Sequence, residues 1–259
     1  MTGEGTIEPR LSREQLARVI PMLKSVDSVE LKVSVAPEAH RATIQGLPID
    51  PVEAQPRQVY FFDTPELALD QAGIVVRARR IQGGRGDTVV KLRPVEPTDL
   101  PEELRRNAAV KVEVDVMPGG FVCSASFKGK ATAAEISDTV AGKSPLSGLL
   151  SKDQRGFFTE HAPSGIELDR LVSLGPTFLL KTMFTAEELG RRIVVEMWLY
   201  PDGSRILELS LKCLPSEAFQ VAAEAQHYLH SHGVDLTSAQ QTKTRAALDH
   251  YRDQLKVEG

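Results

Sequence analysis

The strongest constraint on the fold is an alternation of apolar and polar residues that recurs along the chain. It appears first in residues 27–35, DSVELKVSV, where apolar residues alternate with charged or small polar ones. A period of two places successive side chains on opposite faces of a β-strand. Similar stretches predict further strands at residues 41–47, 57–63, 74–82, 88–94, 110–118, 166–174, 177–184, 191–201 and 205–215.

Helical periodicity is confined to the two ends and the middle of the chain. Residues 11–24 carry apolar side chains at helical spacing, and Ser12 followed by Gln15 suits a helix start. Residues 217–256 have a similar pattern, and residues 119–165 predict short helices and loops. Many short strands with helices between and around them favour an α+β protein with an antiparallel sheet or barrel, not a doubly wound sheet.

Bulk properties indicate an ordinary soluble protein. The 259 residues are 25% charged and 41% hydrophobic, with a formal net charge of -4. This balance gives no reason to expect a nucleic acid or membrane partner, and no apolar run is long enough for a transmembrane helix. The first residues, MTGEGTIEPR, show no secretory leader. With only two cysteines, a cytoplasmic location is expected. Oligomeric state is not indicated.

Charged residues share one face of almost every predicted strand. Two arrangements fit this pattern: a sandwich whose charged faces meet solvent, or a closed barrel with the charges inside and helices on its apolar exterior. For the barrel, the lining has nine bases and five acids. The bases are Lys32, Arg77, Arg79, Lys91, Arg93, Lys111, Lys181, Arg192 and Lys212, and the acids are Glu30, Glu113, Asp115, Glu196 and Glu208.

A barrel lined in this way would bind a highly anionic ligand. Unpaired bases repel one another in a confined space, so an excess of bases needs an anion to neutralise it. Carboxylates in the same place suit hard divalent cations such as Mg²⁺ or Mn²⁺. Bases together with a divalent metal are typical of a polyphosphate site.

Several of these motifs together resemble the CYTH domain, the triphosphate tunnel metalloenzyme superfamily. The hallmark of that family is Glu-x-Glu-x-Lys on the first strand, and SVELK at 28–32 occupies its place. The other segments occur in family order: YFFDTPELALDQAGIVVRARR at 60–80, VVKLR at 89–93, KVEVDV at 111–116, ILELSLK at 206–212 and QQTKTRAAL at 240–248. The resemblance covers residues 28–250, so residues 1–26 are expected to form a helical extension and residues 27–259 the barrel domain.

The resemblance implies an eight-stranded antiparallel barrel whose tunnel binds a triphosphate and one or two divalent ions, Mg²⁺ or Mn²⁺. It implies that the phosphates are bound by nine bases: Lys32, Arg77, Arg79, Lys91, Arg93, Lys181, Arg192, Lys212 and Lys243. Of these, it implies a catalytic role for Lys32, Arg77, Arg79, Lys91 and Arg93. It also implies metal binding by Glu30, Glu196 and Glu208, with Glu113 and Asp115 positioning bases or holding a second ion.

Two departures from the family pattern leave the reaction open. Ser28 replaces the first glutamate of the hallmark, and Ser210 replaces an acid on the strand at 206–212. Asp27 is no substitute, because a shift of one residue along a strand points to the other face. Members of the family hydrolyse inorganic triphosphate, thiamine triphosphate or nucleoside triphosphates, and one branch makes cyclic AMP. The expectation is a metal-dependent triphosphatase; the alternatives are a polyphosphate-binding module without turnover and an adenylate cyclase.

Overall fold

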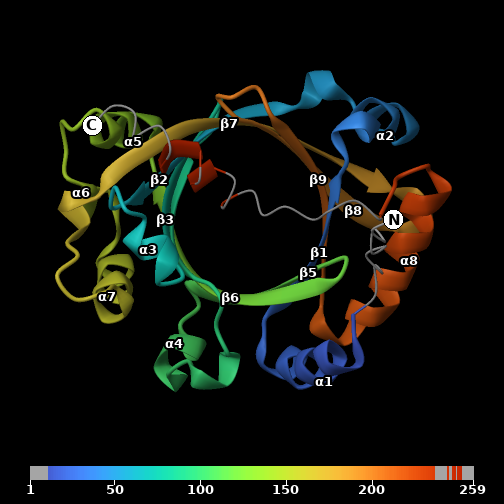
Figure 1. The fold of residues 1–259 in the computed structure, drawn as a ribbon, viewed down its shortest axis with the longest axis horizontal. Coiled ribbons are helices and arrows are strands. Elements are labelled where there is room, and N and C mark those ends of the chain that lie inside the picture. Colours follow the sequence, from blue (N-terminus) through green and yellow to red (C-terminus); the bar gives the residue numbers. More distant parts are fainter. Residues whose placement is uncertain (1–10, 237–243, 245–246, 249, 253–259) are drawn as a thin grey trace, which may run out of the picture.

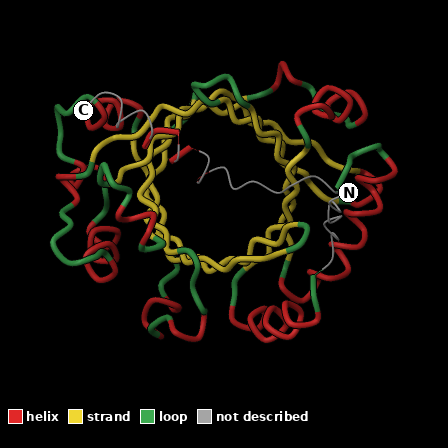
Figure 2. Tube along the Cα trace, viewed as in Figure 1, coloured by secondary structure: helices red, strands yellow, loops and turns green. Residues whose placement is uncertain are grey.

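Nine strands close into a barrel, and the helices lie on its outside (Figures 1 and 2). The computed structural model describes residues 11–236, 244, 247–248 and 250–252. The closed ring excludes the sandwich. The strands are β1 (Ser28–Val35), β2 (Gln55–Asp63), β3 (Ile74–Ile81), β4 (Gly86–Leu92), β5 (Val110–Met117), β6 (Gly120–Ala131), β7 (Val172–Ala186), β8 (Arg191–Leu199) and β9 (Arg205–Cys213).

The ring order is β1-β5-β6-β4-β3-β2-β7-β8-β9, and β9 pairs again with β1. All neighbouring strands are antiparallel except β1 and β5, which are parallel. The prediction of an eight-stranded, purely antiparallel barrel is therefore wrong in strand number and in one pairing. The two errors have one cause: an odd number of strands cannot alternate in direction around a closed ring, so at least one pair must be parallel.

The additional strand is β6, within the region predicted as short helices and loops. Its sequence, GFVCSASFKGKA, is rich in Gly, Ser and Ala, which are weak strand formers. Two other segments also differ from prediction. Residues 41–46 belong to helix α2, which follows a Pro-initiated turn at Pro37 and ends before Leu47, and residues 166–174 enter β7 only from Val172.

Eight α-helices with defined bounds surround the barrel (Figure 1), and the described residues 244, 247–248 and 250–252 are also helical. The eight are α1 (Arg13–Met22), α2 (His40–Gly46), α3 (Ala68–Gln71), α4 (Glu102–Arg106), α5 (Ala133–Val140), α6 (Leu146–Leu149), α7 (Lys152–His161) and α8 (Ala218–Ser231). Helix α1 begins with the predicted capping box, in which Ser12 accepts from the backbone of Gln15. None of these helices is long and apolar enough to cross a membrane.

Alternation along the strands produces two apolar regions outside the barrel and one inside it. The outward side chains of β3 to β6 pack under α1, α5, α6 and α7, while those of β1, β8 and β9 pack under α8. The inner cluster includes Phe61, Leu179 and Trp198 together with Leu248 and Tyr251 near the end of the chain. The Tyr251 hydroxyl lies 3.1 Å from Thr177 Oγ1. This cluster fills part of the barrel, and charged side chains line what remains.

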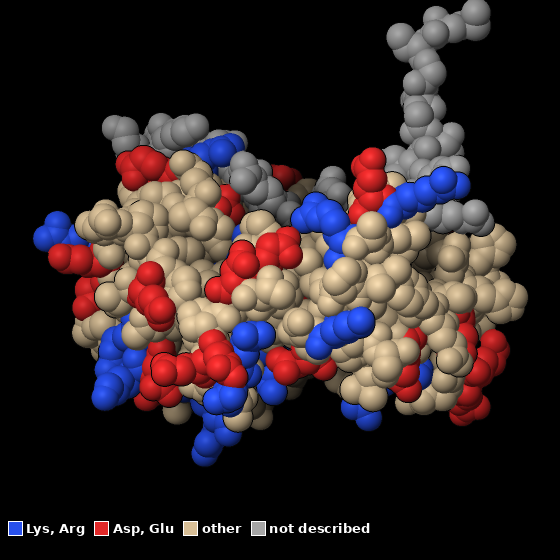
Figure 3. All heavy atoms as spheres, turned by 90° about the horizontal axis from the view of Figure 1, so that it is seen from below, with Lys and Arg blue, Asp and Glu red and all other residues tan. Residues whose placement is uncertain are grey.

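Acidic and basic side chains are interspersed on the outer face seen in Figure 3, with no large area of one sign. Inside the barrel, charged side chains are concentrated on the inward strand faces, as strand parity predicts.

Candidate functional site

A cavity of about 730 Å³ lies inside the barrel and is lined mainly by the inward faces of its strands. It brings together side chains that are far apart in the sequence, because each strand contributes alternate residues. Most of the predicted site residues line it: Glu30, Lys32, Arg77, Arg79, Lys91, Arg93, Glu113, Lys181, Glu196, Glu208 and Lys212.

Three predicted lining residues are not part of the described lining, and a fourth predicted site residue cannot be placed. Arg192 is exposed at the start of β8 and, like the exposed Lys111, is not among the described residues that line the cavity. Asp115 is fully buried, is not among the residues that line the cavity, and forms ion pairs with Lys32 and Arg93 of that lining. Lys243 lies outside the described residues. Arg192 and Lys111 have the right strand parity but lie too close to strand ends, where an inward face meets solvent.

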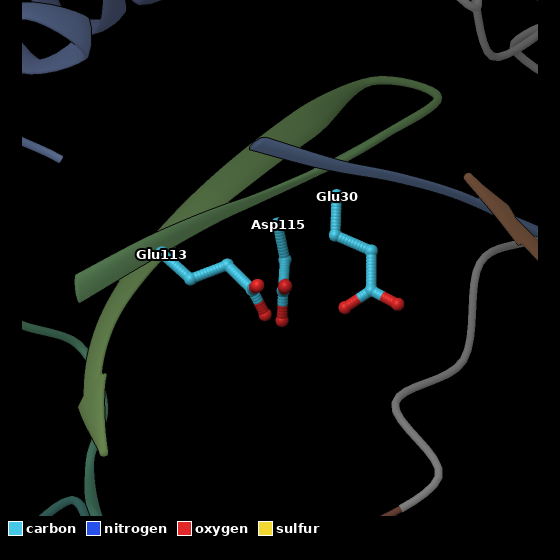
Figure 4. Close-up of side chains that lie close together, drawn as sticks. All are labelled: Glu30, Glu113 and Asp115. Carbon is cyan, nitrogen blue, oxygen red and sulfur yellow. The ribbon is translucent and has the colours of Figure 1, made fainter. Parts of the chain in front are cut away.

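Three carboxylates form a compact acidic cluster on the β1–β5 wall. Glu30, Glu113 and Asp115 each place one oxygen within 4.8 Å of the others, and Figure 4 shows them side by side. Their proximity follows from the parallel pairing, in which Glu30 is opposite Asp115 and Ser28 is opposite Glu113. Oxygen ligands at this spacing are the type that Mg²⁺ and Mn²⁺ prefer.

Each member of the acidic cluster is also close to a base. Lys32 Nζ lies 3.2 Å from Glu30 Oε2 and 3.0 Å from Asp115 Oδ2, and Arg93 lies 3.3 Å from the same Asp115 oxygen. Lys212 pairs with Glu113. Burial lowers the pKa of Lys32, but Asp115, Glu30 and Glu208 outweigh it and leave that pKa raised. Lys32 is therefore firmly cationic and neutralises much of the cluster.

A second pair of carboxylates lies on a separate wall. Glu196 on β8 is opposite Glu208 on β9. Lys181 Nζ lies 3.3 Å from Glu196 Oε1, and Trp198 Nε1 donates to Glu196 Oε2 over 3.2 Å. The resemblance predicts metal binding by Glu30, Glu196 and Glu208, but these three carboxylates are not the ones that lie closest together. Glu30 instead lies beside the two acids of β5, Glu113 and Asp115.

The basic wall of β3 contains a carboxylate that the sequence interpretation overlooked. Arg77 and Arg79 project into the cavity from β3, and Asp87 projects from the neighbouring β4. Asp87 Oδ2 accepts from Arg79 Nε over 3.0 Å and also pairs with its terminal nitrogen. Arg77 lies 3.9 Å from the other Asp87 oxygen. Asp87 is the last residue of the GGRGD segment, whose composition predicts a turn, but it belongs to β4 and has the same parity as Lys91.

Lys91 is the deep cation of the cavity that lacks a counter-ion. It makes no ion pair or hydrogen bond with the residues that the structure describes. Burial, with Lys32 and Arg93 adding repulsion against the attraction of Asp115, lowers the pKa of Lys91 to about 8. Lys128, also overlooked, lines the cavity from β6 and is exposed. Desolvation lowers the pKa of Lys128, and repulsion from Lys212 lowers it further. Both lysines are available to an anion.

The two serines that replace family acids occupy inward positions. Ser28 Oγ donates a hydrogen bond of 2.9 Å to Glu113 Oε2, so a neutral donor stands beside the acidic cluster. Ser210 is buried opposite Lys32 on the neighbouring strand. Asp27 instead accepts a hydrogen bond from the backbone nitrogen of Val112, which agrees with its predicted outward parity.

The charge of the lining is closer to balance than the nine bases and five acids expected. Among the described residues, eight bases and six acids line the cavity, and the fully buried Asp115 is paired with two of those bases. Relative to the expectation, Lys111, Arg192 and Asp115 are absent from the lining, and Lys128, Asp70 and Asp87 are added to it. A polyanion in this cavity would therefore meet carboxylates as well as bases.

Comparison with known proteins agrees with this architecture. No protein-family model and no curated protein matches the sequence. The solved structures that are similar to this chain include two proteins from different organisms. One is a Hippeastrum protein named as a candidate adenylyl cyclase with a dominant triphosphatase activity, with a TM-score of 0.63, 18% identity and coverage of 85% of this chain and 95% of that chain. The other is a candidate adenylate cyclase from Bacillus halodurans, with a TM-score of 0.58, 13% identity and coverage of 85% and 97%.

These identities establish likeness of fold, and the likeness extends over nearly the whole of both solved chains. The closed barrel, its charged interior and its external helices are the features that this chain has in common with the expected family architecture. The chain therefore has the triphosphate tunnel fold, that of the CYTH domain.

Proposed function

We propose that this protein is a divalent-metal-dependent hydrolase of a triphosphate, bound inside the barrel. The observation that carries the proposal is the convergence, in one cavity, of an unpaired buried base, an arginine pair and a cluster of three carboxylates. The triphosphatase activity named for the structurally similar Hippeastrum protein also supports it.

The charge balance of the lining explains why a metal ion would be needed. A triphosphate carries several negative charges, and most of the bases in the cavity already have carboxylate partners. The carboxylates of Glu30, Glu113 and Asp115 fit a hard divalent cation by chemistry and by spacing. Bound there, Mg²⁺ or Mn²⁺ would supply a Lewis acid that neutralises phosphate oxygens.

The residues of the chain itself would bind and orient the phosphates. Lys91 has no ion-pair or hydrogen-bond partner in the part of the chain that the structure describes, and it is the expected first contact of a phosphate group. Arg77 and Arg79 present planar donor groups suited to two oxygens of one phosphate. Cations held on rigid strands around the phosphates stabilise charge that develops on the leaving oxygen during hydrolysis. The strands fix these donors in place, so little reorganisation is needed.

The test is phosphate release from inorganic triphosphate, thiamine triphosphate and ATP, with Mg²⁺, with Mn²⁺ and with EDTA. Hydrolysis that requires a metal and is lost in Lys91→Met would support the proposal. Lys152→Met removes the same charge from an exposed position on α7 and is the matched control. If the wild-type protein releases no phosphate from any of the three compounds, the hydrolase assignment is wrong. Detection of cyclic AMP from ATP would assign a cyclase instead.

The second candidate is a polyphosphate-binding protein without turnover. Ser28 and Ser210 favour it, because each places a neutral hydroxyl where the family pattern has a carboxylate. Fewer anions reduce the attraction of the cavity for a divalent cation, while the bases that bind phosphate are retained. Thermal stabilisation by triphosphate, without phosphate release, would identify this function.

A further inference from the structure

The carboxylate of Asp87 lies among cations that are expected to bind phosphate. Arg79 lies directly opposite Asp87 on the neighbouring strand, and both Nε and a terminal nitrogen of Arg79 donate to Asp87 Oδ2. Arg77 lies on its other side at 3.9 Å. Arg57 and Lys128 are also close enough for Asp87 to raise their pKa values against the lowering effect of burial. One carboxylate is therefore shared among several bases.

The hydrogen bonding in this group is incomplete. Asp87 Oδ1 is buried and has no hydrogen-bond partner among the described residues, and the same is true of Nε of Arg77. Burial, with repulsion from Arg79, lowers the pKa of Arg77 although Asp87 opposes the effect. An anion with several oxygens could accept from Arg77 Nε as well as from Arg79, and the Asp87 carboxylate leaves that Nε without a partner.

An ion pair with only a structural role would face solvent, or all of its buried polar atoms would have hydrogen-bond partners. Asp87, Arg77 and Arg79 instead line the cavity, and each is partly buried, with 19% to 26% of its side chain exposed. We propose that Asp87 is an internal counter-anion, which holds Arg77 and Arg79 when no phosphate is bound, competes with phosphate for them, and so promotes its release. The inference rests on the proposed phosphate-binding role of this cavity.

The consequence differs from that of a residue that merely positions the arginines. A positioning residue strengthens phosphate binding, so its removal weakens binding. A competing counter-anion weakens phosphate binding, so its removal strengthens it and slows the departure of product. Asp87→Asn keeps the size of the side chain and removes the charge, and Asp87→Thr is a second neutral variant with a side chain suited to a strand. Asp87→Glu retains the charge.

The experiment is calorimetric titration of the full chain with inorganic phosphate, and with inorganic triphosphate in EDTA. Both neutral variants should bind phosphate at least about tenfold more tightly than wild type, since a negative charge is removed from a partly buried anion site. Asp87→Glu should bind as wild type does. Asp153→Asn, which removes the same charge from an exposed position on α7, should change nothing. Where hydrolysis is measurable, the neutral variants should lower both KM and kcat.

Unchanged or weaker phosphate binding in the folded neutral variants would overturn the inference. That result would leave the proposed function intact if the wild-type protein still hydrolysed triphosphate. Conversely, tighter phosphate binding by both neutral variants, with no hydrolysis by wild type, would support the counter-anion and exclude the hydrolase. Circular dichroism of each variant identifies any that fails to fold, and the remaining neutral variant then decides.

Discussion

Binding of a triphosphate should be coupled to proton uptake by Lys91. In the ligand-free cavity, burial, together with the repulsion of Lys32 and Arg93 against the attraction of Asp115, lowers the pKa of Lys91 to about 8. A phosphate group beside the ammonium favours its charged form and raises that pKa again. At pH values above 8 the free protein has lost most of this proton, so binding of an anion must restore it.

The size of the effect follows from the pKa. With a pKa of about 8, Lys91 is roughly nine-tenths protonated at pH 7 and roughly one-tenth protonated at pH 9. Uptake by Lys91 on binding should therefore rise from about 0.1 proton at pH 7 to about 0.9 proton at pH 9, if the bound form is fully charged.

Calorimetry in buffers of different ionisation enthalpy measures this uptake, with EDTA present to prevent turnover. Lys91→Met reports the protons exchanged by the triphosphate itself, so the difference between the two proteins isolates Lys91. The variant should also bind triphosphate more weakly. Equal proton uptake by wild type and Lys91→Met at pH 9, or equal affinity, would refute the placement of Lys91 against a phosphate.

Three further results are expected. Keeping Lys91 charged costs the folded state about 3 kcal/mol, because its pKa falls from 10.5 to about 8. The free energy of unfolding of the wild type should therefore rise between pH 8 and 10.5. At pH 7, Lys91→Met should be more stable than the wild type by up to that amount, as measured by urea unfolding. Lys32→Met leaves the fully buried Asp115 carboxylate with less positive charge beside it and should lower the free energy of unfolding by about 3 kcal/mol. Lys212, whose side chain is 52% exposed, should matter less, so Lys212→Met should cost less than about 1 kcal/mol. Equal losses in the two variants would contradict the argument from burial. Ser28→Glu combined with Ser210→Glu should tighten Mg²⁺ binding, as measured by calorimetry. Unchanged Mg²⁺ affinity would count against a metal site at the acidic cluster.

The inward faces of the strands could be predicted from the sequence because side-chain parity is a local property. Lys32, Arg77 and Lys91 each lie on an alternating segment, and the closed ring places all three in one cavity. Parity could not show how deep a residue lies along its strand. For this reason Arg192 was assigned to the lining although it lies exposed at the start of β8. Asp87 is missed for a related reason: the GGRGD composition predicts a turn, whereas Asp87 already belongs to β4, where it faces the cavity.

The grouping of the carboxylates depends on information that no local pattern contains. Strand β6 has a composition of small residues that conceals it, yet its presence makes the number of strands odd. An odd ring requires a parallel pair, and that pair is β1 with β5. The parallel register then sets Glu30 opposite Asp115, across 85 residues of sequence, and completes the acidic cluster with Glu113. The weakest strand signal in the sequence thus decides where a divalent cation can bind.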